Sequence, residues 1–116
     1  QYTMNKLDKE SYDEAKLIFD RIINTNLTTN EKMGALLQNI RDYNKESDRL
    51  TDRANSCTDR YATIFISKRY KIRRLRNALM GICYREGYTP YDISSKFDES
   101  DKDKLLNSPV YNLKLS

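Results

Sequence analysis

Apolar residues recur every three or four positions near the N-terminus, which is the spacing of a helix with one buried face. Ser11 and Glu14 have the spacing of a capping box, in which a serine at a helix start and a glutamate three residues later satisfy free backbone amides. We therefore predict a helix from Tyr12 to Asn24. Its apolar face consists of Ala15, Ile18, Phe19, Ile22 and Ile23.

A second capping box, Thr28 with Glu31, opens another amphipathic stretch. The apolar positions of this stretch are Met33, Leu36, Leu37 and Ile40. The connection between the two predicted helices is short, so they can pack as a hairpin. Residues 1–42 are thus predicted to form an N-terminal helical hairpin.

The next segment, from Tyr43 to Cys57, has few residues that could build a core. A spacing of three and four nevertheless persists through Ser47, Leu50, Ala54, Cys57, Tyr61 and Ile64. This spacing permits one continuous helix from Glu31 to Glu86, about 84 Å long at 1.5 Å per residue. Such a length is typical of a coiled-coil dimer rather than of a globular helix. The alternative is a middle segment that a partner orders.

Positive charge is concentrated between Lys68 and Arg76, where six of nine residues are cationic. Residues 61–88 contain seven Lys or Arg against one carboxylate, whereas the segments before and after each carry a net charge of −1. One face of a helix here would be apolar and the other could bind a polyanion. The second interpretation is a cationic face that is only solvated. The apolar stripe is Ile72, Leu75, Leu79, Ile82 and Cys83; Arg73, Arg74, Asn77, Tyr84 and Arg85 lie opposite, with Arg69 and Arg76 at one edge.

Two features delimit this basic helix. A lysine is costly to bury, and Lys68 would fall in the centre of the apolar stripe, so we predict that the helix begins near Tyr70. Gly87 suits a helix stop, and Thr89 with Pro90 suits the start of a short helix that ends near Lys96. Residues 70–97 then form the basic C-terminal helical part, and residues 98–116 form a tail.

The composition is typical of a single, mainly α domain over residues 1–116. There is no apolar run long enough to cross a membrane and no signal peptide, so we expect a soluble protein that binds no membrane. Cys57 and Cys83 lack the histidine or cysteine neighbours of a zinc site, so we expect two free thiols, no metal and no cofactor.

An enzyme is not expected, because the chain has no histidine that could act as a general base. Ser67 and Lys71 stand four residues apart like a nucleophile and its activator, but a helix rich in both residue types produces such a pair by chance. The carboxylates are expected to be charge partners of arginines, and no small-molecule substrate is expected.

Taken in order, short motifs between Glu14 and Phe97 resemble those of the small-subunit ribosomal protein fourteen family, in its zinc-free bacterial and organellar form. The family's L-Q-x-L-P-R-[DN] resembles Leu37-Gln38-Asn39-Ile40-Arg41-Asp42, and its arginine-bearing stretch ending in N-R-C resembles Arg53-Ala54-Asn55-Ser56-Cys57. Its T-G-R resembles Thr58-Asp59-Arg60, its F-x-L-S-R-I resembles Tyr70-Lys71-Ile72-Arg73-Arg74-Leu75, and its G-x-x-P with a following serine and aromatic matches Gly87, Pro90, Ser95 and Phe97.

The resemblance implies a structural protein of the small-subunit head that binds small-subunit rRNA and neighbouring head proteins. It also implies an extended, irregular middle over residues 43–69, whose backbone polar groups rRNA would satisfy. A mitochondrial ribosome is the expected location, with a plastid or a bacterial cytoplasm as alternatives. The residues expected to bind rRNA, from the charge pattern and the resemblance together, are Arg49, Arg53, Asn55, Arg60, Lys68, Arg69, Lys71, Arg73, Arg74, Arg76, Arg85, Ser95 and Lys96.

A function of a different class stays open: a helical coiled-coil adaptor, or a small viral or phage regulatory protein, that binds another protein. High helicity in the free protein would favour that class, whereas an RNA-ordered middle would favour the ribosomal one.

Overall fold

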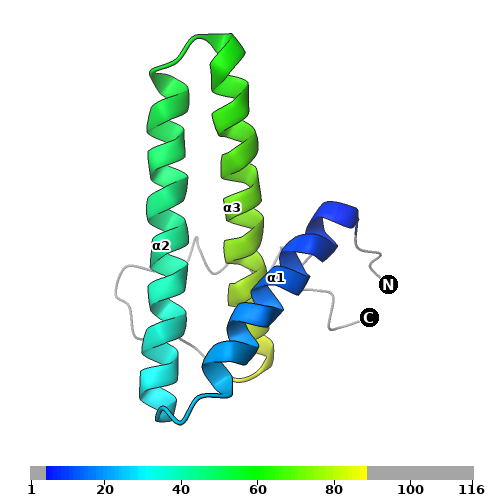
Figure 1. Ribbon diagram of the computed structural model, residues 1–116, viewed down its shortest axis with the longest axis vertical. Coiled ribbons are helices and arrows are strands. Elements are labelled where there is room, and N and C mark those ends of the chain that lie inside the picture. The colour runs from blue at the N-terminus through cyan, green and yellow to red at the C-terminus, as the bar shows by residue number, and fades with distance from the viewer. Residues whose placement is uncertain (1–4, 89–116) are drawn as a thin grey trace.

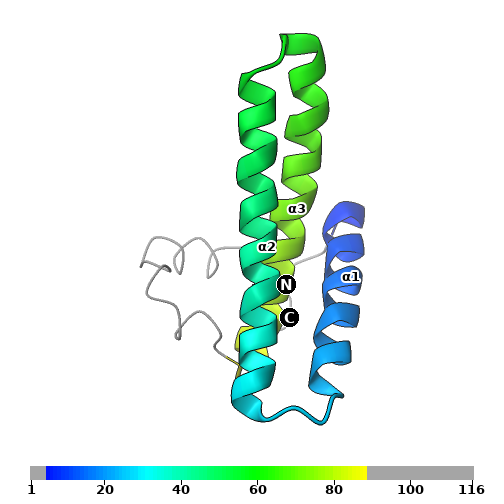
Figure 2. The ribbon, with the colours of Figure 1, turned by 60° about the vertical axis from the view of Figure 1, so that its left-hand side comes forward.

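The computed structural model describes residues 5–88, which form three helices (Figure 1): α1 (Lys6–Ile23), α2 (Thr29–Asn55) and α3 (Asp59–Arg85). The predicted mainly α fold is confirmed. The two long helices, α2 and α3, lie side by side and antiparallel, and α1 packs chiefly on α3 near the end of the hairpin that carries the α1–α2 loop (Figures 1 and 2). The predicted helix at 90–96 and the tail lie outside the described residues.

The two capping boxes predicted from the sequence have different outcomes. Thr28 caps α2 as predicted: its Oγ1 accepts from the Glu31 amide at 3.2 Å, and the Glu31 carboxylate accepts from the Thr28 amide at 3.1 Å. The prediction for α1 is wrong, because this helix begins six residues earlier, where the side chain of Asn5 accepts from the Asp8 amide at 2.8 Å. Ser11 instead lies within α1 and is buried.

The extended middle predicted over residues 43–69 is wrong. The chain continues as α2 to Asn55, turns at residues 56–58, and is helical again from Asp59. Lys68 therefore lies inside α3, although the basic helix was predicted to begin after it. The continuous helix from Glu31 to Glu86 is equally absent, because the turn folds the second half back on the first. The spacing of Ser47, Leu50 and Ala54 is that of a helix face buried against α3.

The hydrophobic core occupies the end of the hairpin that α1 covers. Gly87, with φ of 82°, ends α3 in the left-handed conformation expected of a helix stop, and the Tyr88 amide donates back to the Cys83 carbonyl at 2.8 Å. This turn brings Tyr88 edge-on to Phe19, with ring centroids 5.7 Å apart. The buried cluster consists of Ala15, Phe19, Leu36, Ile40, Ala78, Leu79, Met80, Ile82 and Cys83.

Beyond this core, residues 44–76 form a distal arm of two helices (Figure 1). Its buried side chains are Ser47, Leu50, Ala54 and Leu75. In addition to this sparse apolar burial, three side-chain hydrogen bonds are formed between α2 and α3 within the described part of the chain.

Leu79→Ala should destabilise the protein by about 2 to 5 kcal/mol, because Leu79 is fully buried in the cluster that joins the three helices. Urea denaturation followed by circular dichroism measures the free energy of unfolding. The matched control is Leu17→Ala, since Leu17 is 59% exposed on α1. Equal losses in the two variants would contradict the placement of the core.

Burial raises the pKa of the Cys83 thiol to about 12, from an ordinary value of 9.0. The folded chain therefore keeps a proton that the unfolded chain releases between these two values. This contribution to stability is complete below pH 9.0 and is lost as pH rises toward 12. The urea midpoint should fall more steeply across this window in the wild type than in Cys83→Ala, and Cys57→Ala should behave like the wild type. Parallel slopes for wild type and Cys83→Ala would exclude the effect.

Candidate nucleic-acid interface

Three arginines of α3 donate hydrogen bonds to three neutral side chains of α2, and we call these six residues the arginine ladder. The two residue numbers of each pair add to 120, so the three pairs share one antiparallel register along the hairpin. The pairs are Arg69 Nη1 with Thr51 Oγ1 at 3.1 Å, Arg73 Nε with Ser47 Oγ at 3.1 Å, and Arg76 Nη1 with Asn44 Oδ1 at 2.8 Å.

The sequence produces this ladder through complementary spacing and size. Positions 44, 47 and 51 fall on one face of α2, and positions 69, 73 and 76 fall on one face of α3, because helical neighbours are three and four residues apart. The α2 side chains are short, so the long arginine side chains of α3 can extend across to hydrogen-bond with them. The arginine stems can then cover the interface while the charged ends reach polar atoms.

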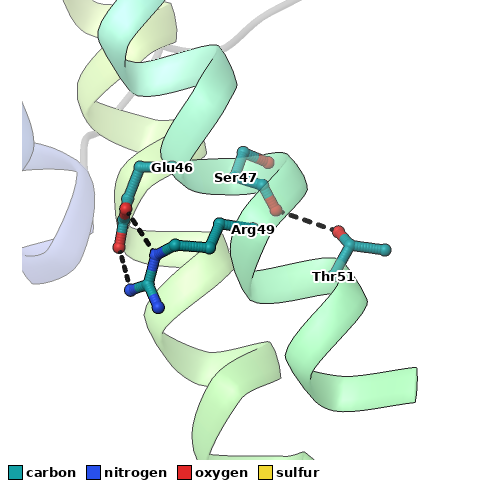
Figure 3. A network of polar contacts seen from close by, with 4 residues as sticks. All are labelled: Glu46, Ser47, Arg49 and Thr51. Carbon is teal, nitrogen blue, oxygen red and sulfur yellow. Dashed lines mark hydrogen bonds and ion pairs between the residues drawn. The ribbon is translucent and has the colours of Figure 1, made fainter. Parts of the chain in front are cut away.

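A hydrogen bond within α2 orients the Thr51 acceptor (Figure 3). The Thr51 hydroxyl donates to the Ser47 carbonyl at 3.0 Å, and this leaves its oxygen free to accept from Arg69. Glu46, the residue before Ser47, accepts two hydrogen bonds from Arg49, from Nε at 2.9 Å and from Nη2 at 2.5 Å. These bonds lower the pKa of Glu46, and the positive charges of Arg49 and Lys68 lower it further. Glu46 is thus engaged by cations outside the ladder.

The charges of Arg69 and Arg73 are not neutralised. Across residues 5–88 neither forms an ion pair, and each bonds a neutral hydroxyl instead. A guanidinium has five N–H donors, so these bonds use only a minority of the donors of Arg69 and Arg73. Among the described residues, the Nε atom of Arg69 is buried without a hydrogen-bond partner, and its guanidinium lies 5.6 Å from the Tyr70 ring centroid. Two half-buried cations, one helical turn apart, therefore lack an anionic partner within residues 5–88.

A second cationic group lies on the arm around Phe65. The guanidinium of Arg53, from α2, and the ammonium of Lys68, from α3, lie 5.2 Å and 6.0 Å from the Phe65 ring centroid. The exposed side chains of Tyr61 and Ile64 precede this group on α3. Lys68 also lowers the pKa of Glu46, which accepts hydrogen bonds from Arg49. The predicted residues Arg49, Arg53 and Lys68 therefore lie in the same part of the arm.

Other predicted binding residues are dispersed. Arg74 lies 3.8 Å from Asp8 of α1, and Arg85 lies 5.3 Å from the Tyr12 ring centroid, so both face α1. Lys71 lines the α1 side of α3, whereas Asn55 and Arg60 are exposed on either side of the turn at residues 56–58. Ser95 and Lys96 lie outside the described residues.

The predicted solvent face of the basic helix needs a correction. Arg73 is predicted to lie opposite the apolar stripe, on the face free to bind a polyanion, but it faces α2 and is half buried. The reason is that α3 packs against two helices, so a single apolar stripe does not describe its buried surface. The α2 acceptors Asn44, Ser47 and Thr51 were missed altogether. Their signal was the helical spacing of short polar residues opposite an equally spaced arginine set.

No helix within residues 5–88 is long and apolar enough to cross a membrane. The same residues contain no cluster of His, Cys, Asp or Glu that could hold a metal ion. No protein-family model matches the chain, and comparison with curated proteins and with solved structures found no significant similarity.

Thr51→Val keeps the side-chain shape but removes the acceptor of Arg69, so it should destabilise the arm by about 1 to 3 kcal/mol. Relative to the wild type, the variant should show a larger increase in hydrogen-exchange rate for amides in residues 44–76 than for amides in the core. Urea denaturation measures the change in the free energy of unfolding. The matched control is Thr63→Val, since Thr63 also bonds the carbonyl four residues earlier but is exposed and has no cross-helix partner. If both valine variants behave alike, the ladder contributes no stability.

Proposed function

We propose that the protein binds RNA as a structural component of the small ribosomal subunit, and that the distal arm contacts RNA phosphates. The observation that supports this proposal best is the state of Arg69 and Arg73. Both guanidiniums are held in place by neutral partners and keep unneutralised charge and free donors. Phosphate oxygens match such donors in both geometry and charge.

The charge of the whole helix supports the same partner. Helix α3 carries eight Lys or Arg residues and one Asp, whereas α2 carries five of each sign. Arg53, Arg60 and Lys68 form no ion pair within the described part of the chain and are exposed, so they can neutralise phosphates without breaking an ion pair of the fold. Contacts of this kind position a protein on RNA without selecting a base sequence.

The proposal that the RNA is that of the small ribosomal subunit rests on the sequence motifs. The helical arm occupies the place of the extended middle that the ribosomal resemblance implies. Small-subunit rRNA and neighbouring head proteins are therefore the proposed partners on the ground of motif order alone. A mitochondrial ribosome is the proposed location, with a plastid or bacterial one as the alternative.

A helical adaptor that binds another protein is the second candidate. Tyr61 and Ile64 favour it, because they are 56% and 50% exposed on the same helix and lie one turn apart. Sedimentation separates the two candidates. The first predicts that the native protein cosediments with small ribosomal subunits in low-magnesium gradients, and the second predicts that it sediments apart from them.

Replacing Arg53 and Lys68 together by alanine should reduce the dependence of RNA affinity on salt by about one to two units of log–log slope, because each neutralised phosphate contributes about 0.7 to 0.9. Fluorescence anisotropy with a labelled RNA at several salt concentrations measures this slope. The double variant Lys9→Ala with Lys16→Ala removes the same charge from α1, where both lysines pair with aspartates, and should leave the slope unchanged. Equal slopes for the two double variants would show that the arm is not the RNA contact.

A further inference from the structure

A groove opens between the N-terminal half of α1 and the middle of α3. It has a volume of about 460 Å³, within the range of binding sites for small ligands and peptide side chains. The groove exists because α1 crosses α3 obliquely (Figure 1), and because two of its lining residues, Ser11 of α1 and Ser67 of α3, are small. Ser11 is 5% exposed. The groove lies on the α1 side of α3, apart from the arginine ladder.

The two walls of the groove carry opposite charges. Glu10 and Glu14 line it from α1, and Lys71 and Arg74 line it from α3. Within residues 5–88, Arg74 approaches Asp8 at 3.8 Å, but Glu10, Glu14 and Lys71 form no ion pair. Apart from the Arg74–Asp8 contact, the charged side chains of the two walls are therefore not paired with one another in the described part of the chain. A bound group that carries both a positive and a negative charge could pair with both walls.

Apolar side chains flank these charges. Leu7 is 52% exposed and Tyr70 is 50% exposed, and both line the groove. A side chain placed between them would remove apolar surface from water on both helices. The carboxylates of Glu10 and Glu14 disfavour a nucleic acid here, because phosphate would meet like charge.

We infer that this groove is a docking site for a segment of a partner protein in which apolar residues lie between a basic and an acidic residue. The basic residue faces Glu10 and Glu14, the acidic residue faces Lys71 beside the Arg74–Asp8 pair, and the apolar residues lie between Leu7 and Tyr70. This pattern is complementary to the walls in charge and to the edges in hydrophobicity. The inference does not depend on RNA binding by the arm.

Two blocked tetrapeptides, Lys-Leu-Leu-Glu and Glu-Leu-Leu-Lys, test the site in both chain directions. Titrated into the ¹⁵N-labelled full chain, one of them should give saturable amide shifts confined to residues 7–14 and 67–74, with a Kd on the order of 1 mM. The variant Glu10→Lys with Glu14→Lys should weaken this binding about tenfold, because the basic residue then meets like charge. The control is Asp13→Lys, since Asp13 is exposed on α1, pairs with Lys9 and does not line the groove.

Three results would overturn the inference: no saturable shift with either peptide, shifts that a blocked Leu-Leu dipeptide reproduces at equal affinity, or binding unchanged by the double reversal. A labelled RNA that shifts the groove residues would instead assign this surface to RNA. Circular dichroism of each variant establishes that it is folded. The RNA salt slope of the same variants is measured in parallel, so a failed groove and a failed RNA proposal give different outcomes.

Discussion

The distal arm depends on how α3 accommodates arginines in its interface with α2. Arg69, Arg73 and Arg76 lie on the face that packs against α2, where an unpartnered charge would destabilise the fold. Short hydroxyl and amide side chains on α2 meet them at matching intervals. These neutral side chains accept hydrogen bonds from the arginines without neutralising their charge. The contacts of Arg69 and Arg73 with α2 therefore hold the hairpin together and leave both guanidiniums positively charged. An aspartate in place of Ser47 would make a stronger pair and a weaker anion site.

The remaining features of the fold follow from the limited length of α1. It covers one end of the hairpin, where the apolar residues of three helices form the core. The other end holds only a few buried side chains, among them Leu50 and Leu75, and polar contacts between α2 and α3 add to them. Where α1 diverges from α3, the groove with opposite charges on its walls remains. Helix α3 is thus shared between two neighbours: its α2 side carries the arginine ladder, and its α1 side carries Lys71 and Arg74.

The parts of the fold that sequence could predict were those with a local signal. The Thr28–Glu31 capping box and the Gly87 stop each depend on a few adjacent residues, and both are confirmed. The spacing of Ser47, Leu50 and Ala54 also indicated a helix, but the scarcity of apolar residues and the family resemblance favoured an extended chain. Ser11 was misleading because a capping-box spacing can occur inside a helix. The ladder could not be found from either helix alone, because each half is an ordinary polar face and only the antiparallel register at the turn joins them.

The central claim is that Arg69 and Arg73 are held by α2 and still offer their charge to phosphate. The side-chain N–H resonances of a protein labelled with ¹⁵N-arginine test it most directly. The Nε–H of Arg73 should exchange slowly with water in the free protein, because it donates to the Ser47 hydroxyl. On addition of RNA, the guanidinium resonances of Arg69 and Arg73 should shift, while those of Arg21, exposed on α1, should stay in place. Equal shifts of all arginines, or no shift of Arg69 and Arg73 when RNA binds, would contradict it.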